Sequence, residues 1–240
     1  MPNGIVRNSD FSKWEGIVEL AQNIEDYEDR MSPDLNASLS LVHNYDAPKQ
    51  QPFLAEVIAY RNHYRNQQHP RIAVVMTHPT YYYISAPEEL SEFCDSVSHI
   101  AYTQNLFQLM EWRRNNPGKL SLVFAETPEA FAAQSSLWLS EGVIDDVVFT
   151  KYNQGYLLDG EECTLSGYQA VYHGGIKGNG CCKETLDCLR KIYPAENVLF
   201  LLFDLVMPEN SRLRDTLENA HEQKISYDNI ITIRAFLESL

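Results

Sequence analysis

The sequence predicts an α/β fold, a three-layer sandwich in which helices cover both faces of a central, mostly parallel sheet. Continuous apolar runs rich in β-branched residues are typical of strands buried on both faces, and three of them stand out, at residues 72–78, 120–126 and 198–206. Segments with apolar residues at helical spacing separate these runs, and such alternation favours a parallel sheet. In sheets of this kind the ligand site lies at the carboxyl ends of the strands.

Further strands and helices complete this alternation. Strands are also predicted at residues 146–151, 168–173 and 229–233, and helices at residues 11–24, 53–65, 87–112 (in two pieces), 128–139, 181–192, 211–220 and 234–240. Turn formers crowd residues 32–52, so that stretch is expected to be a loop with one strand. We expect two parts, a mostly helical N-terminal extension over residues 1–69 and an α/β domain over residues 70–240.

The charge balance limits the classes of partner that we expect for this protein. The chain has 240 residues, 33 of them acidic and 19 basic, which gives a formal net charge of −14. Such a surface repels phosphate backbones and anionic lipid, so neither nucleic acid nor a membrane is expected as a partner. No segment has the apolar length of a membrane span, and the N-terminus lacks the apolar core of a signal peptide. We therefore expect a soluble, cytoplasmic protein.

The cysteines favour reduced thiols over disulfides or a metal site. Five are present, and an odd number without a secretion signal argues against a disulfide framework. They are Cys94, Cys163, Cys181, Cys182 and Cys188. No C-x-x-C pair occurs, and the adjacent Cys181 and Cys182 are poorly spaced as zinc ligands. We expect neither a metal nor another cofactor, and we expect Cys182 and Cys188 to be core residues of the helix at 181–192.

The carboxyl ends of the predicted strands carry the candidate site residues, which are His78, Glu126, Lys151, the loop 174–181 and Asp204. Cys181 begins a helix after a glycine-rich turn, where the helix dipole and backbone N–H groups stabilise a thiolate. Lys151 could lower the pKa of this thiol further, and His78 could take or deliver a proton. Each also has an ordinary structural explanation, as a small buried residue, a solvated lysine and a hydrogen-bonded core histidine.

The glycine-rich stretch HGGIKGNGCCKET (173–185) does not match the phosphate-binding loops. A P-loop requires G-x-x-x-x-G-K-[S/T], and no lysine followed by serine or threonine comes after Gly180. A dinucleotide fingerprint requires G-x-G-x-x-G, whereas Gly175, Gly178 and Gly180 have these spacings in the wrong order. A turn that ends in a nucleophile is the favoured interpretation.

Together these segments resemble the isochorismatase-like (cysteine hydrolase) superfamily, whose fold is Rossmann-like. Members have a strand ending in a catalytic Asp, a strand ending in a catalytic Lys, and a turn G-V-x-T-N-x-C-V-x-x-T that ends in the nucleophile. GIKGNGCCKET (175–185) is similar to that turn, DVVFTKY (146–152) to the strand ending in lysine, and RIAVVMTHPTYYYI (71–84) to the first strand and its loop. The likeness covers about residues 70–240.

The resemblance implies a role for each matched residue. It makes Cys181 the nucleophile and Lys151 the catalytic lysine. The turn residues Ile176, Lys177, Gly178 and Gly180 would form the oxyanion hole. Apart from the resemblance, Glu126 and Asp204 are secondary candidates for an acid near the site because they end neighbouring strands, and Asp46 of the extension is a further one. Tyr82, in the run of three tyrosines at residues 81–83, is a secondary candidate because that run could cover a ligand or a dimer face. The chain departs from the family where His78 occupies the place of the catalytic Asp and Thr80 that of a nearby Gln.

Three functions are left open by these residues. The first is a hydrolase in which Cys181 attacks a small amide or related C–N substrate, with His78 replacing Asp as the proton shuttle. The second is a catalytically degenerate member that acts as a ligand-binding or protein-interaction module. The third is isochorismatase-type vinyl-ether hydrolysis, which needs an acid and not a thiol, so the missing Asp counts against it. We expect a small-molecule substrate and a homo-oligomer, with a dimer as the first choice.

Overall fold

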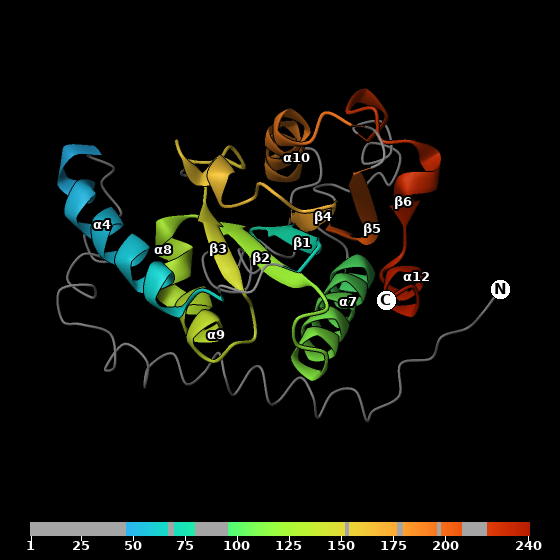
Figure 1. Cartoon of the computed structure of the whole chain (residues 1–240), viewed down its shortest axis with the longest axis horizontal. Coiled ribbons are helices and arrows are strands. Elements are labelled where there is room, and N and C mark those ends of the chain that lie inside the picture. Colours follow the sequence, from blue (N-terminus) through green and yellow to red (C-terminus); the bar gives the residue numbers. More distant parts are fainter. Residues whose placement is uncertain are drawn as a thin grey trace.

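The computed structural model has a parallel sheet at its centre (Figure 1). It describes residues 47–66, 70–79, 96–151, 154–176, 180–195, 198–207 and 220–240. The strands of the described chain are β1 (Ile72–Thr77), β2 (Ser121–Glu126), β3 (Asp146–Phe149), β4 (Ala170–Ile176), β5 (Leu199–Met207) and β6 (Ile230–Ile231). They lie in the order β3-β2-β1-β4-β5-β6, and each of these neighbouring pairs is parallel. The predicted α/β fold is confirmed.

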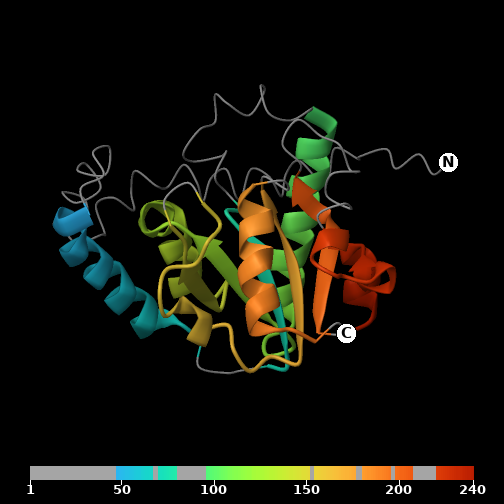
Figure 2. The same ribbon diagram turned by 90° about the horizontal axis from the view of Figure 1, so that it is seen from above.

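Helices cover both faces of the sheet, which gives the three predicted layers (Figures 1 and 2). One face carries α4 (Ala47–Tyr64), α7 (Ser96–Asn115), α8 (Pro128–Ala130), a π-helical turn (Phe131–Ser135), α9 (Ser136–Ser140) and α12 (Ile233–Glu238). The other face carries α10 (Cys181–Ile192). Short 3-10 helices lie at Glu161–Cys163 and Tyr227–Asn229.

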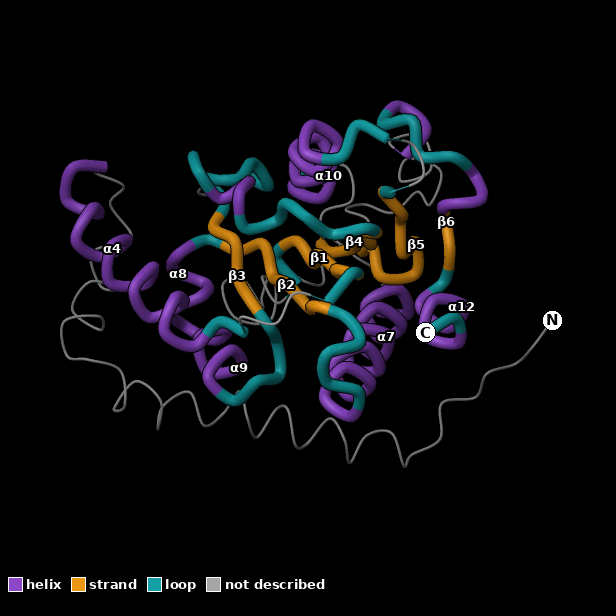
Figure 3. The backbone as a smooth tube through the Cα atoms, in the orientation of Figure 1, coloured by secondary structure: helices purple, strands orange, loops and turns teal. Residues whose placement is uncertain are grey.

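Each central strand contributes alternate side chains to two hydrophobic cores. Val74 and Met76 of β1 belong to the core on the α7 side, whereas Ala73 and Val75 belong to the core under α10, and none of them is exposed. This alternation is the period of two that a strand imposes on its side chains. Because both faces are covered, the strands are continuously apolar, which is why the sequence marks them clearly. The tube in Figure 3 shows the strands enclosed between the helix layers.

Helix α4 shares a core with the sheet. The sequence predicts this helix from residue 53, and the structure begins it at Ala47. Phe53 and Val57 are buried in the core on the α7 side, and the ring of Tyr60 meets that of Phe131 edge-on, with centroids 6.1 Å apart. Residues 1–46, with the predicted helix 11–24, lie outside the described residues, so the division of the chain after residue 69 stays a prediction.

Two charged side chains cover the outer side of the edge strand β3. Arg61 of α4 donates through Nη1 to the carbonyl oxygen of Val147 (3.2 Å), and Glu161 Oε2 accepts from the N–H of Phe149 (3.3 Å). Arg61 and Glu161 are both buried, and their Nη1 and Oε2 atoms are 2.5 Å apart. An uncovered edge strand invites pairing with another chain. This ion pair closes the β3 side of the sheet.

Most predicted element boundaries are confirmed to within a few residues. The strand predicted at 146–151 ends at Phe149, because Thr150 starts a loop that bridges back to Leu157. The strand predicted at 168–173 lies at Ala170–Ile176 and so reaches into the glycine-rich stretch. Most of the predicted helix 211–220 lies outside the described residues. Of the described helices, none is both long and apolar enough to cross a membrane.

Candidate functional site

The carboxyl ends of β1, β2 and β3 bring three of the predicted residues to one edge of the sheet. The N–H of His78 donates to the carbonyl oxygen of Ala125 (2.8 Å), and the N–H of Thr150 donates to that of Glu126 (2.8 Å). The parallel hydrogen bonding therefore continues one residue past β1 and β3. It places His78, Glu126 and Lys151 at the ends of neighbouring strands.

Cys181 is the first residue of α10 and lies at the same edge, because residues 177–180 alone separate α10 from the end of β4. The residue is 6% exposed. Backbone N–H groups in the first helical turn lack partners within the helix, and the helix dipole favours negative charge there, so this position stabilises a thiolate. Of the predicted oxyanion residues, Ile176 ends β4 and Gly180 precedes α10. Lys177 and Gly178 lie outside the described residues.

His78 combines a strained backbone with a buried ring. Its φ of 43° lies in the left-handed region, which few residues other than glycine adopt. The residue is buried, and its Nε2 lies 2.9 Å from Thr150 Oγ1. Strain of this kind costs about 1–3 kcal/mol and is concentrated at functional sites. The His78 ring reaches past the end of β2 to the residue that precedes Lys151.

The chain that follows β3 carries Lys151 and packs against the start of α10, where the predicted nucleophile lies. The N–H of Lys151 donates to the carbonyl oxygen of Tyr156 (2.8 Å), so the chain turns back on itself. Lys151 is exposed, whereas Gly155 is buried against α10. A Cβ atom at Gly155 would lie 1.8 Å from the carbonyl oxygen of Cys181. Contact between this loop and the Cys181 peptide therefore connects the two predicted catalytic residues.

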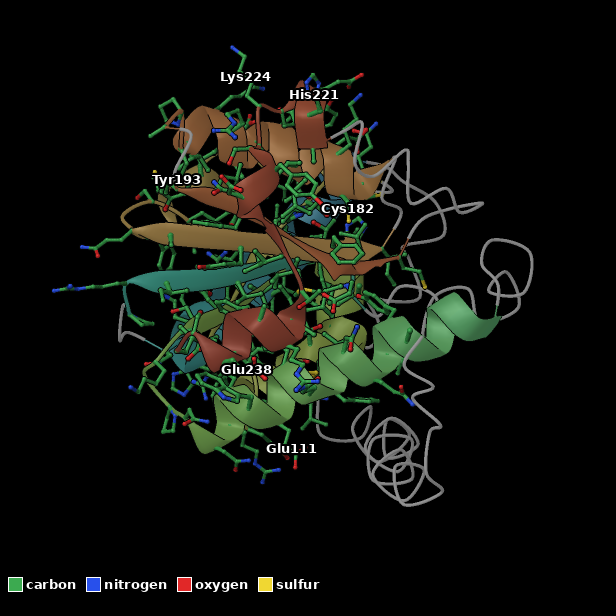
Figure 4. All side chains as sticks on the ribbon, turned by 90° about the vertical axis from the view of Figure 1, so that its right-hand side faces the viewer. Glu111, Cys182, Tyr193, His221, Lys224 and Glu238 are labelled. Atoms are coloured by element: carbon green, nitrogen blue, oxygen red, sulfur yellow. The ribbon has the colours of Figure 1, made fainter. Side chains whose placement is uncertain are left out.

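The neighbouring thiol, Cys182, faces the core instead of the edge. Its Sγ donates to the carbonyl oxygen of Ile176 (3.1 Å). Burial raises the pKa of Cys182 well above its ordinary value, and negative charge on Cys181 adds to that rise. Figure 4 shows Cys182 and Tyr193 near opposite ends of α10. Both pack in the core under this helix together with Cys188, so the expected core placement of Cys182 and Cys188 is confirmed.

A buried histidine that the sequence did not single out lies under this thiol. His173 of β4 is completely buried, and its Nε2 lies 2.9 Å from Thr77 Oγ1. Thr77 is also hydrogen-bonded to Cys182, so the three side chains form one chain of contacts. Burial lowers the pKa of His173 to about 3, which keeps the ring neutral. Its Nδ1 has no hydrogen-bond partner in the described part of the chain.

The secondary candidates are only partly described. Glu126 is fully buried at the end of β2 and accepts a hydrogen bond from the hydroxyl of Ser135. Tyr82 and Asp46 lie outside the described residues. Where the structure is described, no three His, Cys, Asp or Glu side chains are grouped so that they could hold a metal ion.

Asp204 does not end its strand, contrary to the expectation, because β5 continues to Met207. The carboxylate accepts from the N–H of Ile233 (2.8 Å) at the start of α12. Burial raises the pKa of Asp204. Since α12 covers the face opposite α10, this carboxylate has a structural contact away from Cys181.

Comparison with known proteins places the fold. No protein-family model and no curated protein sequence matches the chain. A solved structure from Oleispira antarctica, described as an isochorismatase hydrolase, superposes with a TM-score of 0.51 at 11% identity, over 72% of this chain and 98% of that one. The chain therefore has the isochorismatase-like fold.

Two further solved structures are similar at lower scores. An isochorismatase-like hydrolase from Alkaliphilus metalliredigens has a TM-score of 0.46 at 14% identity, over 70% of this chain and 98% of that one. N-carbamoylsarcosine amidase from Thermoplasma acidophilum has a TM-score of 0.44 at 13% identity, over 68% of this chain and 96% of that one.

Proposed function

We propose that this isochorismatase-like fold carries a hydrolase of that superfamily, with Cys181 as the nucleophile and a small amide or related C–N compound as the substrate. The observation that carries the proposal is the packing of the loop after Lys151 against the Cys181 peptide at the start of α10. This contact joins a thiol at a helix N-terminus to a loop with a cationic side chain, the combination that favours a reactive thiolate.

The reaction runs in two steps. The Cys181 thiolate attacks the carbonyl carbon and forms a C–S bond, and backbone N–H groups at the start of α10 hold the oxyanion. The C–N bond then breaks as His78 gives a proton to the leaving amine. Water attacks the resulting thioester while His78 takes a proton back, which releases the acid and restores the thiolate. Lys151 acts by charge alone and stabilises the thiolate.

His78 is suited to the proton transfers by its position and chemistry. An imidazole titrates near neutral pH, so it can exchange protons where a carboxylate would need its pKa raised. The Thr150 hydroxyl holds Nε2 of His78, which orients the ring. This arrangement supports His78 as a replacement for the carboxylate that the family resemblance leads one to expect.

A panel of small amides and carbamoyl compounds, assayed by amine or ammonia release, tests the proposal. Cys181→Ala should lower turnover at least about a thousandfold. His78→Asn should lower it roughly a hundredfold or more, and asparagine tolerates the left-handed backbone at this position. Cys188→Ala, a buried thiol two turns along the same helix, should leave turnover unchanged. Undiminished hydrolysis in Cys181→Ala would refute the assignment.

The proposal also includes the class of substrate, the cellular location and the oligomeric state. The net charge of −14 disfavours nucleic acid, so we propose a small-molecule substrate. We also propose that the protein is cytoplasmic and forms a homo-oligomer, with a dimer as the first choice. Sedimentation velocity of the full chain tests the dimer.

A non-catalytic, ligand-binding role is the second candidate. It is favoured by the replacement of the family's catalytic Asp by His78, which removes the carboxylate that the resemblance assigns to the reaction. In that case the amide panel would show binding, by shifts in thermal unfolding, without turnover in the unmodified protein.

A further inference from the structure

We infer that Glu184 and Thr185 are positioning residues that hold the loop of Lys151 beside Cys181, an inference that rests on the proposed function. The loop leaves the sheet at the end of β3, and Lys151 itself is exposed. The strands place the backbone of Lys151 at the sheet edge but do not hold the loop that follows it against α10. A contact farther along the loop does.

Backbone hydrogen bonds close this loop at its base. Thr150 and Leu157 form an antiparallel bridge at its base, and Lys151 N–H donates to the carbonyl oxygen of Tyr156 (2.8 Å). The N–H of Gln154 donates back to the carbonyl oxygen of Lys151 (3.1 Å). Gly155 immediately precedes Tyr156, so a contact that fixes Gly155 also restrains the backbone of Lys151 through the hydrogen bond between Lys151 and Tyr156.

Gly155 is bound to α10 through both of its backbone polar groups. Its N–H donates to Glu184 Oε2 (2.6 Å), and its carbonyl oxygen accepts from Thr185 Oγ1 (2.8 Å). The Thr185 residue is fully buried, and a hydrogen bond to a carboxylate is stronger than one between neutral groups. Only glycine fits here, because a Cβ atom would lie 1.8 Å from the Cys181 carbonyl oxygen.

Glu184 and Thr185 follow Cys181 by three and four residues, one helical turn. Residues at these spacings share a side of a helix. Thus the turn of α10 that starts with the nucleophile also binds the loop that carries the lysine. A negative side chain in the first turn is favoured by the helix dipole, which stabilises the Glu184 carboxylate there. The two hydrogen bonds of Gly155 set the separation of Lys151 and Cys181.

Alkylation of Cys181 by iodoacetamide at pH about 7, resolved from Cys182 by tandem mass spectrometry, tests this inference. Lys151→Met should slow alkylation about tenfold, which corresponds to a rise of about one unit in the pKa of the Cys181 thiol. Glu184→Ala should slow it roughly three- to tenfold, and Glu184→Gln should stay within about twofold of the unmodified protein because its amide oxygen still accepts the bond. The double variant Glu184→Ala/Lys151→Met should be no slower than Lys151→Met alone.

The matched control is Lys183→Met. It removes an exposed ion pair with Glu222 (2.9 Å) and leaves both hydrogen bonds of Gly155 in place, so alkylation should be unchanged. Circular dichroism confirms that each variant is folded. Should Glu184→Ala not fold, Glu184→Asp replaces it, because the shorter side chain keeps the charge but cannot reach Gly155.

The possible failures are distinguishable. If Lys151→Met slows alkylation and Glu184→Ala does not, the inference is wrong and the proposed function stands. If the two effects multiply, Glu184 acts independently of Lys151 and the inference is wrong. If alkylation is as slow in Glu184→Gln as in Glu184→Ala, the charge of Glu184 and not its hydrogen bond to Gly155 is responsible, and the inference is wrong. If Lys151→Met has no effect, the proposed role of the lysine fails together with the inference.

Discussion

The flank of β3 and the carboxyl edge of the sheet are held together by different chemistry. The β3 flank comprises Arg61, Arg113, Asp145, Asp146 and Glu161. Two buried ion pairs connect it, Arg113 with Asp145 and Arg61 with Glu161. At the carboxyl edge, the contacts between described residues that place the site are made by hydroxyl, imidazole and backbone groups and by the carboxylates of Glu126 and Glu184.

The difference bears on the reactivity that we propose for the carboxyl edge. A buried ion pair has to be kept complete, because one partner alone is an uncompensated charge. Such pairs suit the flank, where α4 and α7 must stay attached. Neutral hydrogen bonds cost less to desolvate and leave the charge state of a nearby thiol to be set by the helix dipole and Lys151.

Removing one partner of a flank ion pair should have the largest effect on the free energy of unfolding. Arg113 donates through Nε to Asp145 Oδ2 (2.7 Å) and through Nη2 to Oδ1. Arg113→Ala leaves that buried carboxylate without its cation, and we expect the free energy of unfolding to fall by about 3–5 kcal/mol in urea titrations. Arg114→Ala, an exposed neighbour on α7, should change it by less than about 0.5 kcal/mol. Equal losses in the two variants would remove the contrast between flank and edge.

The flank also contains a carboxylate whose neutralisation should stabilise the fold. Burial raises the pKa of Asp146 from 3.8 to about 6, against the opposing effects of a hydrogen bond from Val147 and the charges of Arg61 and Arg65. The folded protein thus binds this proton more tightly than the unfolded chain. The stability from this group is fully present below the unfolded pKa of 3.8 and is lost as the pH rises through 6.

Asp146→Asn should therefore raise the free energy of unfolding at neutral pH, by at most about 3 kcal/mol. Urea unfolding at a series of pH values measures this gain. It should be small near pH ~4, grow up to about pH 6 and then level off. Asp159→Asn, which makes the same change at an exposed carboxylate, is the control. A gain for Asp146→Asn that is independent of pH would contradict the explanation.

A neutral contact at the carboxyl edge should matter less. Thr77→Val keeps the shape of the side chain but removes the hydroxyl that joins His173 to Cys182. We expect a loss of about 1–2 kcal/mol in the free energy of unfolding, since His173 then has no partner for Nε2. Differential scanning calorimetry of the variant measures the change. A loss as large as that of Arg113→Ala would show that the edge and the flank do not differ in the way described.

Those features that depend on local pattern were predictable from the sequence. The strands β1, β2 and β5 are continuous apolar runs, and α10 has a buried stripe through Cys182, Leu186 and Leu189. Since parallel strands end at a common edge, the sequence also predicted that His78, Glu126 and Lys151 would lie near one another. The structure places all of them at the ends of neighbouring strands.

Contacts between distant segments were not predictable in the same way. Glu184 and Thr185 are ordinary polar residues of a helix, and the sequence does not show that their partner is Gly155 in a loop 30 residues earlier. His173 was interpreted only as part of a predicted strand, and its partner Thr77 is 96 residues away in the sequence. The spacing of Glu184 and Thr185 one turn after Cys181 was the available signal for a second role of α10.

The apparent pKa of the Cys181 thiol tests the central claim most directly. It is obtained from the rate of iodoacetamide alkylation of Cys181 between about pH 5 and pH 10, followed by site-resolved mass spectrometry in the unmodified protein and in Lys151→Met. We predict an apparent pKa clearly below the ordinary value of about 8.5, and a rise of about one unit in Lys151→Met. An apparent pKa at or above about 8.5 that does not change in Lys151→Met would contradict the assignment of Cys181 as the nucleophile.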